Sequence, residues 1–209
     1  MFEVLCHRSP FKSVDEITSE TLSSIDFNLL LSFADGTEAP SKISTRAALF
    51  YNDDFLFILF FGRYEQLRLS ESSKEEWKTM QLWEQSDVYE VFVGVNAAIE
   101  KKYKEFQLSP DGRYFDSDVD LANGTSNHQW ESGLQGISMV FPTPQKWYSV
   151  FGIPWKCFSQ DYKNDIIHIN LYRASGKFHG DELLALCPTG YGSKCFHRPE
   201  KFGKLVIVE

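Results

Sequence analysis

The 209-residue chain is poor in cysteine, in positive charge and in long apolar runs, and each shortage argues against a class of protein. Its four scattered cysteines, Cys6, Cys157, Cys187 and Cys195, are too few for a disulfide scaffold. A net charge of −8 without a dense lysine or arginine cluster argues against a nucleic-acid partner. The most apolar run, 55–61, falls far short of the roughly 18 residues that a membrane span needs.

Catalytic signatures are also missing. The chain has no Gly-x-Ser-x-Gly elbow, no phosphate-binding glycine loop and no Cys-x-x-Cys pair. Cys187, Cys195 and His197 lie near one another in the sequence but lack a fourth zinc ligand. Glu90 and Glu105 could supply the two carboxylates of a glycoside hydrolase, yet no other feature supports hydrolysis. The sequence therefore favours a binding module over an enzyme, with no cofactor required.

The N-terminus has no apolar signal-peptide segment, because residues 1–10 already include Glu3, His7 and Arg8. Two interpretations stay open: a cytosolic protein, or a secreted protein whose leader has been removed.

Aromatic side chains are abundant, at 15% of the chain, and they favour strands, where they pack well on a pleated surface. Alternating or apolar segments predict about ten strands with little helix. We therefore expect an all-β protein, an antiparallel β-sandwich forming one domain over residues 1–209. The expected strands cover residues 2–5, 27–33, 45–51, 55–61, 88–95, 103–108, 113–115, 133–141, 146–153, 165–173, 182–186 and 204–208.

Helix is expected at two places only. Residues 13–25 predict a short helix or an ordered loop, and 71–80 predict a brief helix within a polar insertion over 63–81. Residues 116–129 are expected to form a polar loop. The turn at 52–54, between two strand patterns, predicts a tight hairpin.

The stretch 83–94 carries the strongest functional signal. Trp83 lies in a polar loop that runs directly into a strand pattern, and alternation places Glu90 on the less apolar face of that strand. An indole can stack on a sugar ring, and a fixed carboxylate can accept bonds from sugar hydroxyls. Packing of Trp83 under its own loop, and an ion pair for Glu90, are the structural alternatives.

Strand alternation predicts that further polar side chains lie near Trp83 and Glu90. Gln107 shares the face of Glu90 if the two strands pair, and Asn170 and Tyr172 share a polar face that could line the same groove. Arg173 has the opposite parity and is expected to be a structural residue.

Asp116, Asp118 and Asp120 place three carboxylates at alternating positions, a spacing that is found at the start of calcium loops. A helix–loop–helix site would need glycine at the sixth position and glutamate at the twelfth, where Leu121 and Asn127 stand. A structural calcium at these aspartates is therefore an expectation beside the interpretation as an ordinary polar loop.

The order of these pieces resembles carbohydrate-binding module family 9 and its relatives. The similarity is collinear and consists of several short segments, none of which is specific alone. The matching segments are 45–57, 83–85, 90–93, 103–112, 147–154, 170–173, 188–189 and 196–206. Segment 45–57 contains an acidic turn, 147–154 ends in Ile-Pro, 170–173 has the sequence Asn-Leu-Tyr-Arg, and 196–206 is the C-terminal signature.

The resemblance implies a β-sandwich in which two tryptophans clamp a terminal sugar, often with structural calcium, attached to xylan-degrading enzymes. Trp83 and Glu90 match the family's motif. Leu186 stands where the family has its second tryptophan, and Tyr191 is the substitute that we expect. Gln107 and Ser109 stand where the family has arginine and asparagine. The resemblance therefore predicts a carbohydrate-binding module, with a related interaction domain that has lost sugar binding as the alternative.

Overall fold

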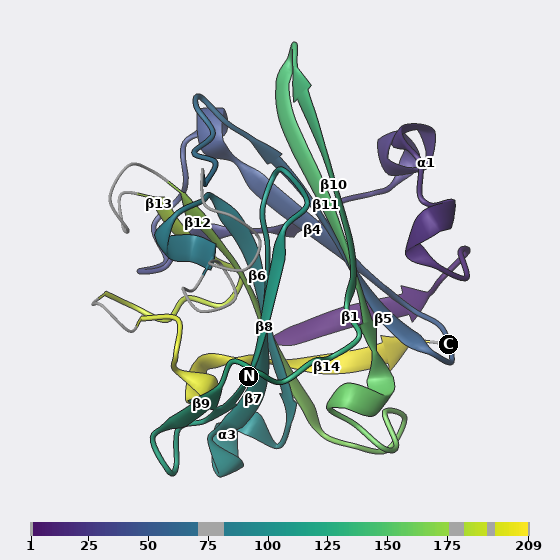
Figure 1. The fold of residues 1–209 in the computed structure, drawn as a ribbon, viewed down its shortest axis with the longest axis vertical. Helices are drawn as coiled ribbons and strands as arrows, with labels where there is room; N and C mark the ends of the chain where they lie inside the picture. The colour runs from purple at the N-terminus through teal and green to yellow at the C-terminus, as the bar shows by residue number, and fades with distance from the viewer. Residues whose placement is uncertain (1, 71–81, 176–181, 192–194, 209) are drawn as a thin grey trace.

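The computed structural model describes residues 2–70, 82–175, 182–191 and 195–208, and it is built almost wholly from strands. Figure 1 shows the strands curling around a common centre, with short helices at the periphery. The strands are β1 (Glu3–Arg8), β2 (Leu29–Leu30), β3 (Ser32–Phe33), β4 (Thr45–Tyr51), β5 (Phe55–Arg63), β6 (Val88–Val95), β7 (Lys102–Leu108), β8 (Tyr114–Asp120), β9 (Thr125–Asn127), β10 (Gln135–Pro142), β11 (Gln145–Pro154), β12 (Ile167–Ser175), β13 (Glu182–Ala185) and β14 (Gly203–Val208).

Helical segments in the described ranges are short. Two are α-helical, α1 (Ser19–Ser24) and α3 (Ala97–Glu100), and the others are 3₁₀ turns at Val14–Glu16, Ser41–Ile43, Leu82–Glu84, Trp155–Cys157 and Pro199–Lys201. The expected helix or loop over 13–25 is thus a 3₁₀ turn followed by α1, whereas the helix predicted at 71–80 lies outside the described residues. None of the helices in the described ranges has the length and apolarity to cross a membrane.

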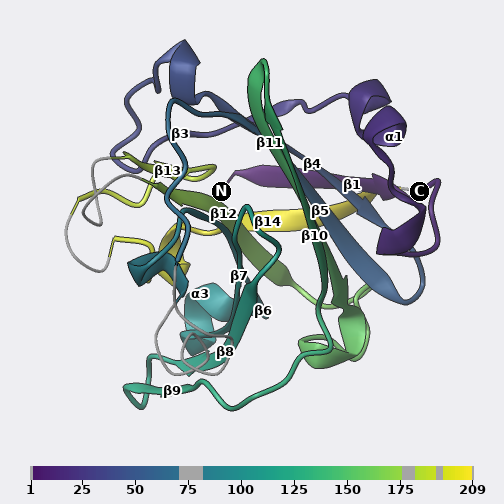
Figure 2. The same cartoon turned by 45° about the horizontal axis from the view of Figure 1, so that its top comes forward.

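The strands form one curled sheet in the order β10-β11-β5-β4-β1-β14-β12-β6-β7-β8-β9. Most neighbours are antiparallel, but β1 pairs in parallel with both β4 and β14. Figures 1 and 2 show β1, in purple, and β14, in yellow, side by side between the two ends of the sheet. The predicted all-β, sandwich-like fold is confirmed, with these parallel pairs as an addition.

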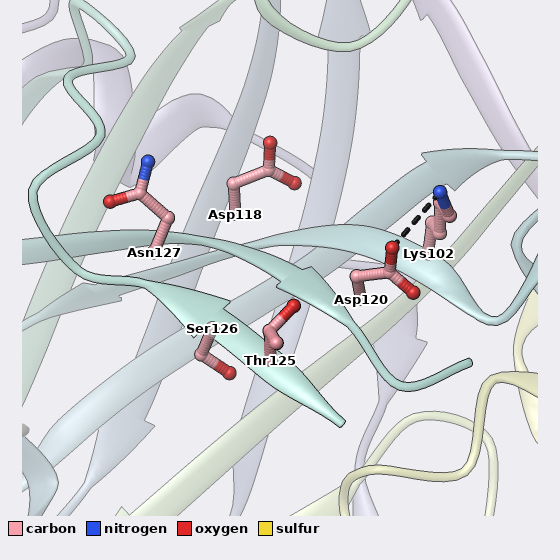
Figure 3. A pocket seen from close by; sticks show the side chains of 6 residues that line it. All are labelled: Lys102, Asp118, Asp120, Thr125, Ser126 and Asn127. Carbon is pink, nitrogen blue, oxygen red and sulfur yellow. Dashed lines mark ion pairs between the residues drawn. The ribbon is translucent and has the colours of Figure 1, made fainter. Parts of the chain in front are cut away.

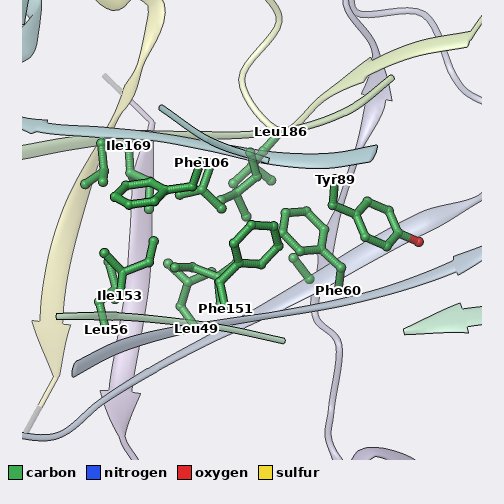
Figure 4. Packing of buried hydrophobic residues seen from close by; sticks show 14 of the residues in the cluster. Leu49, Leu56, Phe60, Tyr89, Phe106, Phe151, Ile153, Ile169 and Leu186 are labelled. Carbon is green, nitrogen blue, oxygen red and sulfur yellow. The ribbon is translucent and has the colours of Figure 1, made fainter. Parts of the chain in front are cut away.

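The main core fills the space between the two halves of this sheet. Figure 4 shows Phe60 and Phe151 from one half facing Tyr89 and Phe106 from the other. The Phe60 and Tyr89 rings are stacked at 4.5 Å, and the Tyr89 ring lies 3.8 Å from that of Trp147. Burial of these large rings accounts for much of the apolar driving force of folding.

The hairpin predicted around residues 52–54 is confirmed. The Asn52 side-chain oxygen accepts bonds from the backbone amides of Asp54 and Phe55, at 2.9 and 2.8 Å, and so closes the turn between β4 and β5. The apolar run that follows is a central strand, because β5 lies between β4 and β11.

Two local predictions are wrong. The segment 27–33 does not form one strand but two short ones, β2 and β3. The expected polar loop over 116–129 is mostly strand, because β8 continues to Asp120 and β9 pairs with it. Alternation explains this: Phe115, Ser117 and Val119 are buried on one face of β8, and on the other face lysines of β7 pair with two of the three aspartates.

The face of strands β12, β6, β7 and β8 that points away from the main core is itself covered. Phe92, Tyr103, Tyr172 and Phe196 form a second apolar cluster there. The Phe92 and Tyr103 rings stack at 5.1 Å, and those of Tyr172 and Phe196 stack at 4.0 Å. This covered face also carries the residues from which the sequence predicts a site.

Candidate functional site

Strand register brings three of the predicted residues into one row. Glu90 on β6 pairs with Gln107 on β7, and Tyr172 on β12 pairs with Glu90 from the other side. Paired residues in a sheet share a face, so the three side chains lie next to one another on the face of the second apolar cluster. The expectation that Glu90 and Gln107 share a face is confirmed.

Gln107 connects this row to the Trp83 loop. Its side-chain oxygen accepts a hydrogen bond from the backbone N–H of Trp83 at 3.0 Å, while its side-chain nitrogen donates to Glu105 at 2.6 Å. Arg68 holds the same loop by donating to the carbonyl oxygen of Trp83 at 2.7 Å. Gln107 is completely buried, so these bonds are well shielded from water.

Trp83 lies in the 3₁₀ turn Leu82–Glu84 that precedes β6. Its side chain is half-buried and packs against the second apolar cluster. The indole is therefore partly exposed. It is neither fully exposed for stacking on a ligand nor fully packed under its own loop, the two possibilities that the sequence leaves open. Part of its surface remains accessible at the end of the Glu90 row.

Glu90 and Glu105 are two buried carboxyl groups on neighbouring strands, exposed by only 3% and 2%. Burial, and then the charge of Glu105, raises the pKa of Glu90 well above its usual value. Burial raises the pKa of Glu105 to about 7, against the smaller opposing effect of the bond from Gln107. Within the described parts of the chain neither carboxylate forms an ion pair, so the alternative expected for Glu90, an ion pair, is not found there.

Asn170 and Tyr172 are fully buried, and their polar atoms are bonded within the protein. The Asn170 side-chain nitrogen donates to the Tyr172 hydroxyl at 2.9 Å and to the carbonyl of Cys187 at 2.8 Å. The Tyr172 hydroxyl donates to the carbonyl of Phe196 at 2.9 Å. These side chains therefore fasten the C-terminal segment to β12, and their predicted contact with a ligand stays a prediction.

Arg173 has the structural role that its parity predicts. It is 1% exposed, and one guanidinium nitrogen donates to the carbonyls of Ile43 and Arg63 and to the Thr45 hydroxyl, at 3.0, 2.7 and 3.0 Å.

The predicted sugar clamp needs a second aromatic side chain opposite Trp83, and the contacts of Leu186 and Tyr191 do not place either residue there. Leu186 is buried as part of the main core. Tyr191 is 78% exposed, and its hydroxyl donates a hydrogen bond to Asp35, in the turn after β3. That bond ties the tyrosine to the turn, and among the described residues no hydrogen bond or ring contact joins it to Glu90. Its role as a clamp residue stays a prediction.

The three aspartates of the expected calcium site each have other partners. Asp116 accepts bonds from the backbone and hydroxyl of Ser132, Asp118 pairs with Lys104 at 2.6 Å, and Asp120 pairs with Lys102 at 2.9 Å. Within the described ranges no three acidic, cysteine or histidine side chains are grouped closely enough to share a metal ion. The calcium site stays a prediction without support from this geometry.

A hollow of about 300 Å³ lies over the edge of this sheet, at β7, β8 and β9. Figure 3 shows it lined by Asp118 and Asp120 together with Lys102, and the dashed line marks the Lys102–Asp120 ion pair. The carboxylates are neutralised by lysines, so the hollow offers hydroxyl and amide groups of β9 and little free charge.

Sequence reasoning missed three polar groups on the Glu90 face. Ser117 pairs with Glu105 and has a buried hydroxyl without a hydrogen-bond partner in the structure. The Tyr103 hydroxyl lies 2.5 Å from Nδ1 of His197. Alternation along β7 and β8 could have found Tyr103 and Ser117, since they have the parity of Glu105, but no local pattern indicates His197.

Comparison with models of protein families and with curated proteins finds no match. Solved structures do match along almost the whole chain. A candidate carbohydrate-binding protein from Bacteroides uniformis is 16% identical, with a TM-score of 0.70 and 99% of each chain covered. A carbohydrate-binding module of family 9 from Caldicellulosiruptor kristjanssonii, in complex with cellotriose, is 12% identical, with a TM-score of 0.66 over 98% of this chain and 93% of that one.

The same type of module in complex with glucose is 11% identical, with a TM-score of 0.63 over 99% of this chain and 95% of that one. The protein therefore has the fold of carbohydrate-binding module family 9, as the sequence resemblance predicts. At these identities the likeness establishes the fold, and the ligand must be argued from the residues.

Proposed function

We propose that this chain is a non-catalytic carbohydrate-binding module that recognises a sugar, or the end of a glycan, with Trp83 and the adjoining row of polar side chains. The observation that carries the proposal is the bond between Gln107 and the backbone of Trp83. It fixes a partly accessible indole next to the strand pair that holds Glu90. A flat apolar wall beside polar groups of fixed orientation is the chemistry that a pyranose ring requires.

Calorimetric titration with cellotriose, xylotriose and mannotriose tests this function. Cellotriose is included because a protein of the same fold is in complex with it, and xylotriose because the family resemblance suggests xylan. We expect at least one of the three to bind with a dissociation constant below 1 mM, which corresponds to roughly −4 kcal/mol. No binding by folded protein at millimolar sugar would contradict the proposal.

Trp83→Ala is expected to weaken binding about tenfold, the equivalent of a stacking contribution near 1.4 kcal/mol. Trp130→Ala is the matched control, because Trp130 is also half-buried but packs on Phe106, on the opposite face of β7. Equal losses in the two variants would show that the effect is not specific to the Trp83 face.

The second candidate function is an interaction domain that keeps the fold and has lost sugar binding. Burial of Leu186 in the main core favours it, because the position of the family's second tryptophan then contributes no wall. Folded protein that binds none of the three oligosaccharides would select this candidate. Hydrolysis by Glu90 and Glu105 is the weaker alternative, and unchanged oligosaccharides after long incubation would remove it.

A further inference from the structure

The Glu90 face combines two buried carboxyl groups with a buried hydroxyl that has no hydrogen-bond partner. Glu90 is 3% exposed and its carboxylate has no hydrogen-bond partner among the described residues. Ser117, opposite Glu105 in the register, has a buried hydroxyl that is also unpartnered. Buried polar groups are nearly always bonded, so the Ser117 hydroxyl can take a partner from outside the chain.

The titratable groups that interact with this carboxyl pair are acidic as well. Glu90 influences the protonation of Tyr103, Tyr172 and Cys195, and each of these groups is neutral when it holds its proton. None of them can supply the positive charge that would compensate two buried carboxylates.

The basic groups of the described residues near this pair are engaged elsewhere. Lys102 and Lys104 pair with Asp120 and Asp118, on the opposite face of β7. Arg198, which acts on Cys195, donates to the carbonyls of Thr189 and Tyr191.

His197 is directed at the hydroxyl of Tyr103 through Nδ1. Within the described ranges, therefore, neither Glu90 nor Glu105 has an ion-pair partner.

Two adjacent buried carboxyl groups without a cation cannot both ionise at low cost. A neutral sugar would leave the cost of ionising both groups unchanged, because hydroxyl groups carry no charge to offset it. A ligand with an ammonium group lowers that cost, because its positive charge lets both carboxylates ionise and its three N–H groups can bond to them.

We infer that this face is selective for a positively charged sugar, an amino sugar with a free ammonium group that lies between Glu90 and Glu105. The inference rests on the proposed function, since Trp83 supplies the wall for the sugar ring. The Ser117 hydroxyl, opposite Glu105, is then available to a neighbouring ligand hydroxyl.

The test compares three matched oligomers by calorimetry near pH 6.5: the glucosamine trimer, its N-acetylated form and cellotriose. We expect the glucosamine trimer to bind at least tenfold more tightly than either neutral trimer. Ammonium binding should also release a proton from the carboxyl pair to the buffer. The heat of binding should therefore depend on the buffer for the glucosamine trimer and not for cellotriose.

Glu90→Gln and Glu105→Gln are each expected to reduce the preference for glucosamine at least fivefold. Glu100→Gln is the matched control, because Glu100 is exposed at the end of α3 and its loss changes the net charge equally. Unchanged preference in the Glu90 and Glu105 variants would overturn the inference. Methylammonium serves as a probe for the amine alone, and equal affinity for it and for the glucosamine trimer would also overturn the inference.

The two proposals fail in different ways. Equal or tighter binding of cellotriose would overturn the amino-sugar inference and leave the carbohydrate-binding function intact. Absence of binding to all three trimers, by protein that remains folded, would overturn both.

Discussion

Replacement of Glu105 by glutamine should make the protein more stable at neutral and alkaline pH. The carboxyl group is 2% exposed, and burial raises its pKa from 4.5 to about 7. The folded state therefore binds this proton more tightly than the unfolded chain does. The resulting stabilisation is complete below pH 4.5 and is lost as the pH rises through about 7.

The size of this change in stability follows from the size of the pKa shift of Glu105. A tenfold change in proton affinity is worth about 1.4 kcal/mol, so ionisation of Glu105 should cost roughly 3 kcal/mol of the free energy of unfolding by pH 8. Glutamine mimics the protonated form and keeps an oxygen that can accept the bond from Gln107. In a chain of this size the variant's melting temperature at pH 8 should rise by roughly 6–12 °C.

Urea unfolding of wild type and Glu105→Gln between pH 5 and pH 8 measures this effect. The difference in the free energy of unfolding should be small at pH 5 and should grow with pH. Glu100→Gln, at an exposed site, should change the stability by less than about 0.5 kcal/mol at every pH. A pH-independent difference for Glu105→Gln, or a variant less stable than wild type at pH 8, would refute the reasoning.

Two further substitutions test the connection of the site to the core. Gln107→Leu removes the acceptor of the Trp83 amide and the donor to Glu105, so we expect a loss of about 1–3 kcal/mol in the free energy of unfolding in urea and weaker sugar binding. The control Gln145→Leu, at an exposed site, should change neither quantity. Unaltered sugar binding by Gln107→Leu would count against a role of Gln107 in holding Trp83. Gly62→Ala places a methyl group against the hydroxyl of Tyr89, whose ring is held by stacking, so it should cost about 1–3 kcal/mol or more. Adding Tyr89→Phe should recover part of that loss, and a double-mutant cycle without coupling would show that the clash is relieved elsewhere.

Much of the fold follows from alternation and turn chemistry along the chain. The central hairpin could be predicted because an Asn-Asp-Asp turn separates two apolar segments, and an asparagine side chain closes such a turn with local bonds. The shared face of Glu90 and Gln107 could be predicted for the same kind of reason, since side-chain parity is a local property of a strand.

Alternation is also present in β8, where the acidic composition predicts a loop. Three of residues 116–120 are aspartates, which favours a loop, although Phe115, Ser117 and Val119 have strand parity. The carboxylates are accommodated in a strand because Lys102 and Lys104 lie beside them on β7. Each lysine is 14 or more residues away from its aspartate in the sequence, so no local pattern reveals that the aspartates are paired with positive charges.

By itself, the sequence determined which residues form strands and which side chains share a face, because both depend on neighbours along the chain. Only the tertiary structure decided how deeply those side chains are buried and which partners they find. Asn170 and Tyr172 have the parity of a binding groove, yet they are bonded to Cys187 and Phe196, because the C-terminal segment folds over them. Burial and partnership depend on segments that are distant in the sequence, and those are set by packing of the whole chain.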